Sequence, residues 1–243
     1  MALSYPLIRR RDENLTATGV VFVEDVKSRV LDQPFTDDRI RGVRGKLGYD
    51  RADSYGGINL LHGTLSQGVG GFGGTREDNP LASRTGGHPE FTKLEVLASR
   101  QQSLQALMPG LSLYGSAYSQ FAWHSLLLPE QCSFGGRSFG RAFDPSALTG
   151  DRCVSGLAEV RFDPTFVGNP FRQFQVYGFV DAGAIERLTH AAGTLPHQWA
   201  SSAGSGVRIH WREHLSANVE AGRSIAGDVD LGWRGHVELT VRY

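Results

Sequence analysis

The last eight residues, HVELTVRY (236–243), alternate between polar and apolar side chains. Val237, Leu239, Val241 and Tyr243 lie on one side, and the polar residues between them lie on the other. Because successive side chains of a β-strand point to opposite faces, this pattern predicts a strand with one apolar and one polar face. A sheet of such strands separates an apolar phase from water.

The same alternation continues toward the amino terminus. It is clear in residues 158–163, 174–181, 207–211 and 215–221, and weaker in residues 15–24, 40–50, 57–67, 91–100 and 111–121. Together these segments predict about ten antiparallel strands of roughly ten residues each, which is the length of a β-strand that spans a membrane. No segment predicts a helix, so the expected fold class is all-β.

The composition restricts the class of protein further. The 243 residues include 25 basic and 25 acidic side chains, so there is no excess of positive charge for binding nucleic acid. No stretch approaches the roughly 20 consecutive apolar residues of a transmembrane helix, so only a β-barrel could cross a membrane. Charged residues fall on the polar face of their strands, as at Lys46, Arg161, Arg208 and Arg242. A lipid-facing arginine at mid-bilayer costs about 2–4 kcal/mol, so we assign the polar face to the lumen.

The connections between the predicted strands also differ in length. Residues 69–89, 123–151 and 183–202 are long and polar, whereas 163–172 and 212–213 are shorter. Long loops on one side and short turns on the other are typical of outer-membrane barrels. A soluble β-sandwich would alternate too, but it would not need aromatic residues at so many strand ends. These residues are Tyr49, Phe121, Trp123, Phe162, Phe174, Trp211, Trp233 and Tyr243.

Two cysteines, Cys132 and Cys153, lie on either side of a polar, glycine-rich stretch. They have neither CxxC spacing nor a histidine at zinc-ligand spacing, so no metal site is predicted. His210 and His214 belong to a strand, turn, strand run and do not add one. A disulfide that closes the loop and a pair of free thiols both remain open.

Three segments carry a family resemblance. Within the long loop the sequence reads FGGRSFGRAFD (134–144), the next strand reads LAEVRF (157–162), and a later one reads GFVDAG (178–183). These segments resemble the haemolysin secretion/activation family, the outer-membrane transporters of two-partner secretion. In that family a long loop folds back into the lumen and presents an arginine followed by a glycine and an aromatic residue.

The resemblance implies roles for individual residues. The lumen-loop motif is Gly140, Arg141, Ala142 and Phe143. Ala142 stands where the family usually has glycine, and Asp181 matches the aspartate that accepts the loop arginine. Alternation independently places Asp181 and Glu159 on the luminal face. Because arginine and carboxylate can form two parallel charge-assisted hydrogen bonds, we expect Arg141 to latch the loop to Asp181, with Glu159 as a second candidate partner.

Members of this family carry a signal peptide, two periplasmic polypeptide-transport-associated domains and a sixteen-stranded barrel. Neither the signal peptide nor those domains are recognisable here, so residues 1–243 are expected to be the carboxy-terminal part of such a barrel, with residues 123–151 as the loop in the lumen. About ten strands would leave an open edge with unpaired backbone groups in lipid. The final strand, which ends at Tyr243, resembles the signal that barrel-assembly machinery recognises for insertion.

The resemblance implies export of a haemolysin-like or adhesin-like exoprotein across the bacterial outer membrane, by a chain in contact with outer-membrane lipid. The sequence predicts no catalytic residue, cofactor or metal, and the protein is not expected to be an enzyme. Two alternatives remain open: a passive diffusion channel and a factor that inserts barrels or lipids. A third is a soluble β-sandwich that binds a partner, which would not need detergent.

Overall fold

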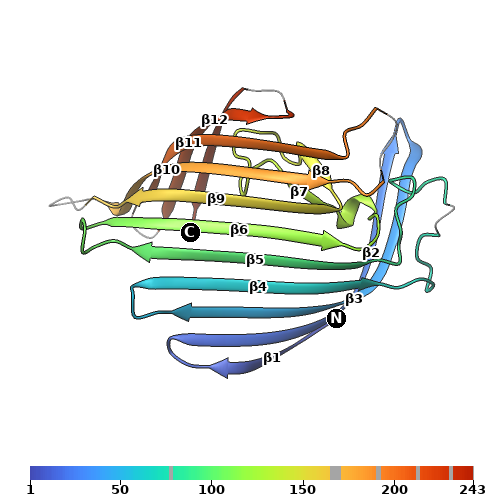
Figure 1. Ribbon diagram of the computed structural model, residues 1–243, viewed down its shortest axis with the longest axis horizontal. Helices are drawn as coiled ribbons and strands as arrows, with labels where there is room; N and C mark the ends of the chain where they lie inside the picture. Colours follow the sequence, from blue (N-terminus) through green and yellow to red (C-terminus); the bar gives the residue numbers. More distant parts are fainter. Residues whose placement is uncertain (77–78, 165–170, 190–192, 212–213, 230–231, 243) are drawn as a thin grey trace.

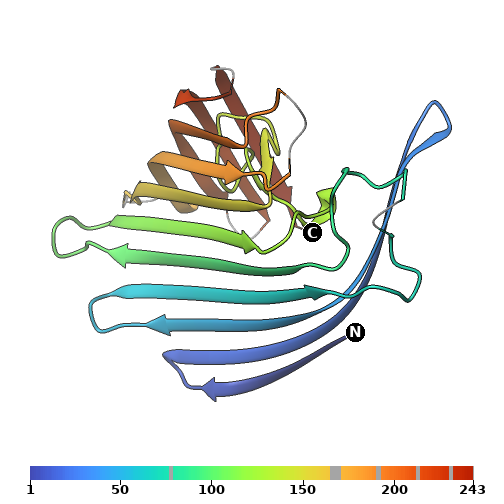
Figure 2. The same cartoon turned by 45° about the vertical axis from the view of Figure 1, so that its right-hand side comes forward.

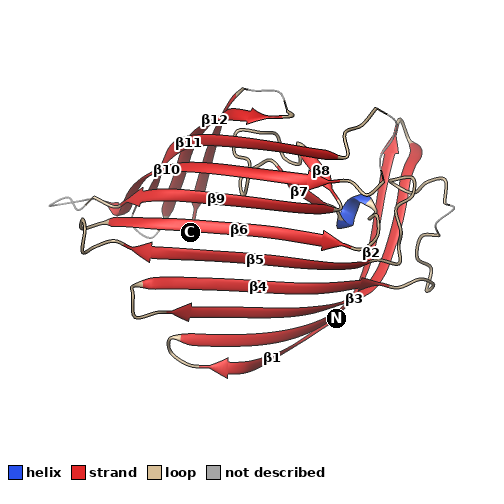
Figure 3. Cartoon of the chain, in the orientation of Figure 1, coloured by secondary structure: helices blue, strands red, loops and turns tan. Residues whose placement is uncertain are grey.

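A computed structural model describes residues 1–76, 79–164, 171–189, 193–211, 214–229 and 232–242. These residues form one antiparallel sheet of eleven strands and a small sheet of two strands. Figure 3 shows strands throughout and one short helix, so the all-β prediction is confirmed. Tyr243, the predicted insertion signal, lies outside the described residues.

The strands of the main sheet follow one another along the chain, and each is hydrogen-bonded to the next. They are β1 (Ala2–Arg9), β2 (Glu13–Val30), β3 (Gln33–Ala52), β4 (Gly57–Gly68), β5 (Thr92–Ser103), β6 (Leu111–Ala122), β9 (Arg152–Phe162), β10 (Phe171–Glu186), β11 (His197–Trp211), β12 (Leu215–Gly227) and β13 (Trp233–Val241). An antiparallel sheet in chain order is the wall of an up-and-down barrel.

The order passes from β6 directly to β9 because residues 123–151, which we call the plug, leave the sheet. The plug contains the 3₁₀ helix η1 (Leu128–Glu130) and the paired short strands β7 (Cys132–Phe134) and β8 (Leu148–Gly150). The main sheet curls so that β7 and β8 lie on its concave side, partly surrounded by β9 to β13 (Figures 1 and 2). The predicted in-folded loop is therefore part of the fold. In the described residues β1 and β13 are not paired, so the sheet is open.

The two faces of the wall differ as the alternation predicted. On β10, Tyr177 and Phe179 are 2 % and 4 % exposed, whereas their neighbour Val180 is 53 % exposed. Val154, Val160 and Val219 on other strands are also more than half exposed. A convex face with so many apolar side chains is suited to lipid rather than to water. None of the described residues forms a helix long and apolar enough to cross a membrane.

The hairpin of β2 and β3 is longer than predicted. Alternation indicated strands over 15–24 and 40–50, but the two strands pair from Glu13 opposite Arg51 to Val30 opposite Gln33, with one register shift between Ser28 and Arg29. Figure 2 shows this hairpin rising beyond the rest of the sheet. The projecting part carries charged residues on both faces, so it lacks the alternation by which the remaining strands were recognised. Hydrogen bonding between the two strands persists there without an apolar face.

Candidate functional site: the plug and its anchors

The plug turns back on itself through residues with left-handed backbone conformation. Gly135, Gly136 and Gly140 have φ values of 117°, 101° and 78°. A Cβ atom on Gly140 would lie 2.8 Å from the backbone nitrogen of Gly135, so this position requires glycine for space as well as for conformation. Ala142 does not share the positive φ, which explains why alanine is compatible with this position of the motif.

Arg141 is the centre of the site. It is 7 % exposed, and its Nη2 atom lies 2.6 Å from Oε1 of Glu159 on β9. Its Nη1 atom lies 3.5 Å from Oε2 of Glu220 on β12. The guanidinium also lies 4.6 Å from the ring centroid of Phe179, within the range of a cation–π interaction. One plug side chain thus bridges strands on two sides of the curled wall.

Asp181 holds the same loop in a different way from the one expected. Its Oδ2 atom accepts a hydrogen bond of 3.1 Å from the backbone N–H of Arg141, and its Oδ1 atom accepts one from the hydroxyl of Ser202. The guanidinium of Arg141 pairs with Glu159 and Glu220 instead. The expected ion pair between Arg141 and Asp181 is therefore corrected: Asp181 fixes the backbone of the motif, and Glu159 receives its charge.

Glu159 is surrounded by arginines. Besides Arg141, its carboxylate is 2.6 Å from Nε of Arg161 and 3.1 Å from Nη2 of Arg208, and none of its side chain is exposed. A fully buried carboxylate requires such partners, because an unpaired buried charge is strongly destabilising. Glu159 is thus the shared anion of three cations, one from the plug and two from the wall.

Cross-strand register explains why the site lies at this position. Phe179 on β10 is opposite Glu159 on one side and Gly204 on the other. Tyr177 is opposite Gly206, and its hydroxyl donates a hydrogen bond of 2.7 Å to Glu220. Cβ atoms on Gly204 and Gly206 would lie 2.6 Å and 2.5 Å from these rings. The glycines let the aromatic rings lie flat on the luminal wall, where Phe179 faces the guanidinium.

Two aromatic residues of the plug contribute to a small core. Phe134 and Phe143 have ring centroids 5.8 Å apart and pack with Leu148 of β8 and Ile185 of β10. Phe143, the predicted aromatic of the motif, is 3 % exposed. This contact buries the apolar side of the plug against the wall, while Arg141 carries its polar side.

A disulfide joins the plug to the wall. Cys132 in β7 is bonded to Cys153 in β9, at a sequence separation of 21. Of the two alternatives left open by the sequence, the structure thus contains the bridge. It encloses all four residues of the lumen-loop motif in one covalent loop.

A second charged cluster near the start of the plug escaped the sequence analysis. Glu130 in η1 is 2 % exposed, and its carboxylate oxygens lie 2.5 Å from Nη2 of Arg44 and 2.9 Å from Nζ of Lys93. Asp151 at the end of the plug is fully buried and is paired with Arg84 at 2.5 Å. No recognisable sequence motif includes Lys93, Glu130 or Asp151. Only their pairing in three dimensions distinguishes these residues from other charged residues.

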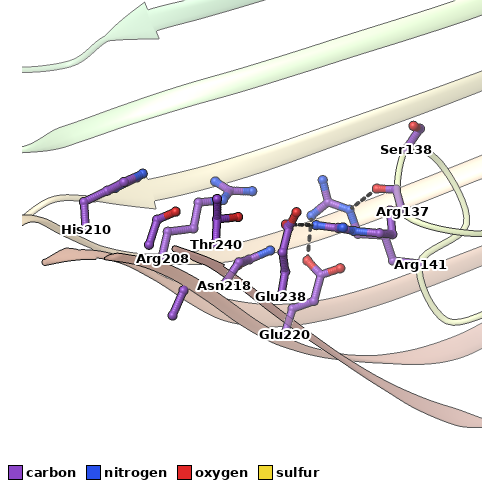
Figure 4. A pocket seen from close by; sticks show the side chains of 11 residues that line it. Arg137, Ser138, Arg141, Arg208, His210, Asn218, Glu220, Glu238 and Thr240 are labelled. Atoms are coloured by element: carbon purple, nitrogen blue, oxygen red, sulfur yellow. Dashed lines mark hydrogen bonds and ion pairs between the residues drawn. The ribbon is translucent and has the colours of Figure 1, made fainter. Parts of the chain in front are cut away.

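Two cavities border the plug. One, of about 560 Å³, lies between the plug and the last strands, and Arg141, Arg208 and Glu220 line it (Figure 4). The other, of about 580 Å³, lies toward β5, β6 and β9, and Tyr114 and Tyr118 line it. Arg137, Ser138 and Arg141 border both, so this part of the plug separates them.

Polar contacts also attach the plug to the last strand. Arg137 pairs with Glu238, and Arg234 pairs with Asp144. Nε2 of His236 lies 2.8 Å from the carbonyl oxygen of Arg141. The plug is thus in contact with the wall on both sides of the curl.

A curled up-and-down sheet, apolar outside and charged inside, with a loop folded onto its concave face, defines the class of plugged outer-membrane β-barrels. The profile of the haemolysin secretion/activation protein ShlB/FhaC/HecB family matches residues 1–209, and the chain belongs to this family. Its members are outer-membrane β-barrel transporters of two-partner secretion, so the predicted family and bacterial outer-membrane location are confirmed.

Solved structures have the same fold. CdiB from Escherichia coli superposes with a TM-score of 0.83 at 18 % identity, covering 99 % of this chain and 44 % of that one. CdiB from Acinetobacter baumannii gives a TM-score of 0.76 at 15 % identity, covering 100 % of this chain and 41 % of that one. The chain thus spans less than half the length of these structures. A search of curated proteins gave no match.

Proposed function

We propose that this chain is the plugged wall of a transporter that moves an unfolded partner exoprotein across the outer membrane through its lumen. The observation that carries the proposal is the bridge from Arg141 of the plug to Glu159 and Glu220 of the wall. Membership of the ShlB/FhaC/HecB family supports a role in protein secretion. The client would be a secreted protein of the haemolysin or adhesin kind.

The plug acts as a latch in this proposal. While Arg141 is paired with Glu159, the plug fills the space between the two cavities and blocks the passage of an extended chain. Asp181 holds the backbone at Arg141, so the side chain is presented in one orientation. An entering client that competes for these polar groups releases the plug. The transfer needs no covalent step, since only ion pairs and hydrogen bonds are exchanged.

The test is secretion of the client by the full-length transporter carrying Arg141→Ala. Loss of the bridge is expected to lower the amount of client outside the cell and to raise the permeability of the barrel to small solutes. Arg29→Ala, an exposed arginine of the β2–β3 hairpin, is the matched control and should change neither. Undiminished secretion in Arg141→Ala would refute the latch. If Arg141→Ala raises the permeability to small solutes but secretion of no protein depends on the transporter, the chain belongs to a passive channel instead.

A further inference from the structure

We propose that the Cys132–Cys153 disulfide divides the plug into a base that stays on the wall and a tip that moves when the client passes. The base is residues 123–132, and the tip is residues 133–150. This inference rests on the proposed function, because it says which part of the plug must move during transport. The tip contains the whole Gly140 to Phe143 motif, and the base contains none of it.

The base is connected to the wall by buried charges. Both carboxylate oxygens of Glu130 are paired with wall cations, and the Nζ atom of Lys93 also donates a hydrogen bond of 2.9 Å to the carbonyl oxygen of Glu130. The side-chain amide of Gln120 donates to the same carbonyl at 3.2 Å. Four contacts from β3, β5 and β6 thus meet at one residue of the base.

Apolar packing and a hydrogen bond to Asp151 also hold the base. Leu126 and Leu127 are at most 1 % exposed and pack with Ile40 and Phe91. The backbone N–H of Leu126 donates to Asp151 at 2.8 Å, so the start of the plug is bonded to its end. Displacing the base would separate this apolar cluster and unpair buried charges together.

The tip is the part that obstructs the lumen. Arg137, Ser138 and Arg141 belong to it and separate the two cavities, whereas Gln131 and Cys132 are the base residues that border a cavity. All the plug residues that border both cavities belong to the tip, so withdrawing the tip removes the plug side chains between them without displacing the base. A transport path therefore needs movement of the tip alone.

The closed disulfide leaves the tip enough chain to clear the lumen. A sequence separation of 21 gives about ten residues out and ten residues back, which reach about 30 Å when extended. This is roughly the thickness of the hydrocarbon core of a bilayer. The bridge therefore limits where the tip is tethered without preventing its withdrawal.

An engineered disulfide can tie the tip to the wall, as the natural disulfide ties the base to β9. A Cβ atom on Gly222 of β12 would lie 3.5 Å from Cβ of Ala142. This separation is within the range of about 3.5–4.5 Å found in disulfides. The double substitution Ala142→Cys/Gly222→Cys should therefore tie the tip to the wall, while Cys132 and Cys153 keep the base tied to β9.

The experiment measures client secretion by the full-length transporter in cells, with and without a membrane-permeant reductant. The tip lock should reduce secretion by about tenfold, and reductant should restore it within about twofold, because reduction breaks the engineered bridge and frees the tip. The single substitutions Ala142→Cys and Gly222→Cys are the controls for packing at each site. Cys132→Ser/Cys153→Ser should secrete within about twofold of the unaltered protein, since the base does not need to be freed.

Two results would overturn the inference. Secretion that persists when gel migration shows the tip disulfide to be fully formed would mean that the tip does not move. A rise of about tenfold on removal or reduction of the natural disulfide would mean that the base has to leave as well. Absence of secretion by the unaltered full-length transporter would instead refute the proposed function. The restored activity after reduction distinguishes a locked protein from a misfolded one.

Discussion

The ring of Phe134 occupies the space that a side chain at Gly183 would need. A Cβ atom on Gly183 would lie 2.2 Å from Cδ2 of Phe134, far inside van der Waals contact. Gly183 is on the luminal face of β10, and Phe134 is in the plug. The absence of a side chain at Gly183, the last residue of the GFVDAG segment, therefore lets Phe134 of the plug pack against the wall.

Gly183→Ala is expected to destabilise the plugged state, because extra atoms in a filled core cost about 1–3 kcal/mol. The measurement is the temperature at which the full-length barrel loses its heat-modifiable migration on a gel. Gly178→Ala on the same strand is the control, since its nearest neighbour would be 3.9 Å away. Equal melting of the two variants would contradict this account of Gly183.

Glu159→Gln is expected to destabilise the protein more than Arg141→Ala. Without Arg141, the Glu159 carboxylate keeps Arg161 at 2.6 Å and Arg208 at 3.1 Å. Without the Glu159 charge, three guanidinium groups share a buried site without their common anion, and breaking such a buried pair costs about 3–5 kcal/mol. Urea unfolding of the refolded full-length barrel would compare the two free energies. A larger loss in Arg141→Ala would show that the plug, rather than the wall, depends on the cluster.

Asp151 makes the junction between the plug and the loops sensitive to acid. Burial raises the pKa of this carboxyl, but Arg84 and the backbone N–H groups of Leu126 and Leu188 outweigh burial and hold the pKa below its usual range. A lowered pKa in the folded state stabilises the protein above the unfolded value of about 3.9, and this contribution is lost as the pH falls through the folded pKa. Unfolding midpoints between pH 3 and 7 should therefore fall at the acidic end. Asp151→Asn should be less stable at pH 7 and show a smaller fall.

Val180→Arg tests which face of the sheet meets lipid. Val180 is 53 % exposed on the convex face, and an arginine there at mid-bilayer would cost about 2–4 kcal/mol. Ser116→Arg on the concave face is the matched control, because Ser116 borders a cavity of about 580 Å³ with room for the side chain. Folding yields into lipid vesicles should fall for Val180→Arg and change little for Ser116→Arg. The opposite order would reverse the assignment of the faces.

Alternation predicted the wall well because one side of each strand meets an apolar phase along its whole length. The pattern at residues 174–181 placed Tyr177 and Asp181 inward and Val180 outward, as the structure has them. Where that constraint ends, the prediction failed. The outer parts of β2 and β3 project beyond the sheet, and residues such as Asp25 and Lys27 there lay outside the predicted strand segments 15–24 and 40–50.

The site was predicted in its residues but not in its connections. Arg141, Glu159 and Asp181 do meet, yet the guanidinium pairs with Glu159, while the two carboxylate oxygens of Asp181 accept hydrogen bonds from the backbone N–H of Arg141 and from Ser202. Glu220 was placed on the luminal face, but nothing in a single sequence indicates that β12 curls around to reach the plug. Curvature results from the whole sheet, and local periodicity does not contain it.

The aromatic rings that lie on Gly204 and Gly206 link residues that belong to different strands. A larger residue at 206 would meet only side-chain atoms, of Tyr177 and Glu220, so it can be accommodated if Tyr177 becomes smaller and Glu220 shifts. At 204 the backbone carbonyl oxygen of Ala221 would lie 2.2 Å from an added Cβ atom, so no change of Phe179 makes room there. Evolution is therefore expected to keep glycine at 204 and to change Tyr177 and Gly206 together, so that these two appear as coupled columns among related sequences. Such coupled columns would reveal the order of neighbouring strands in relatives whose structures have never been determined.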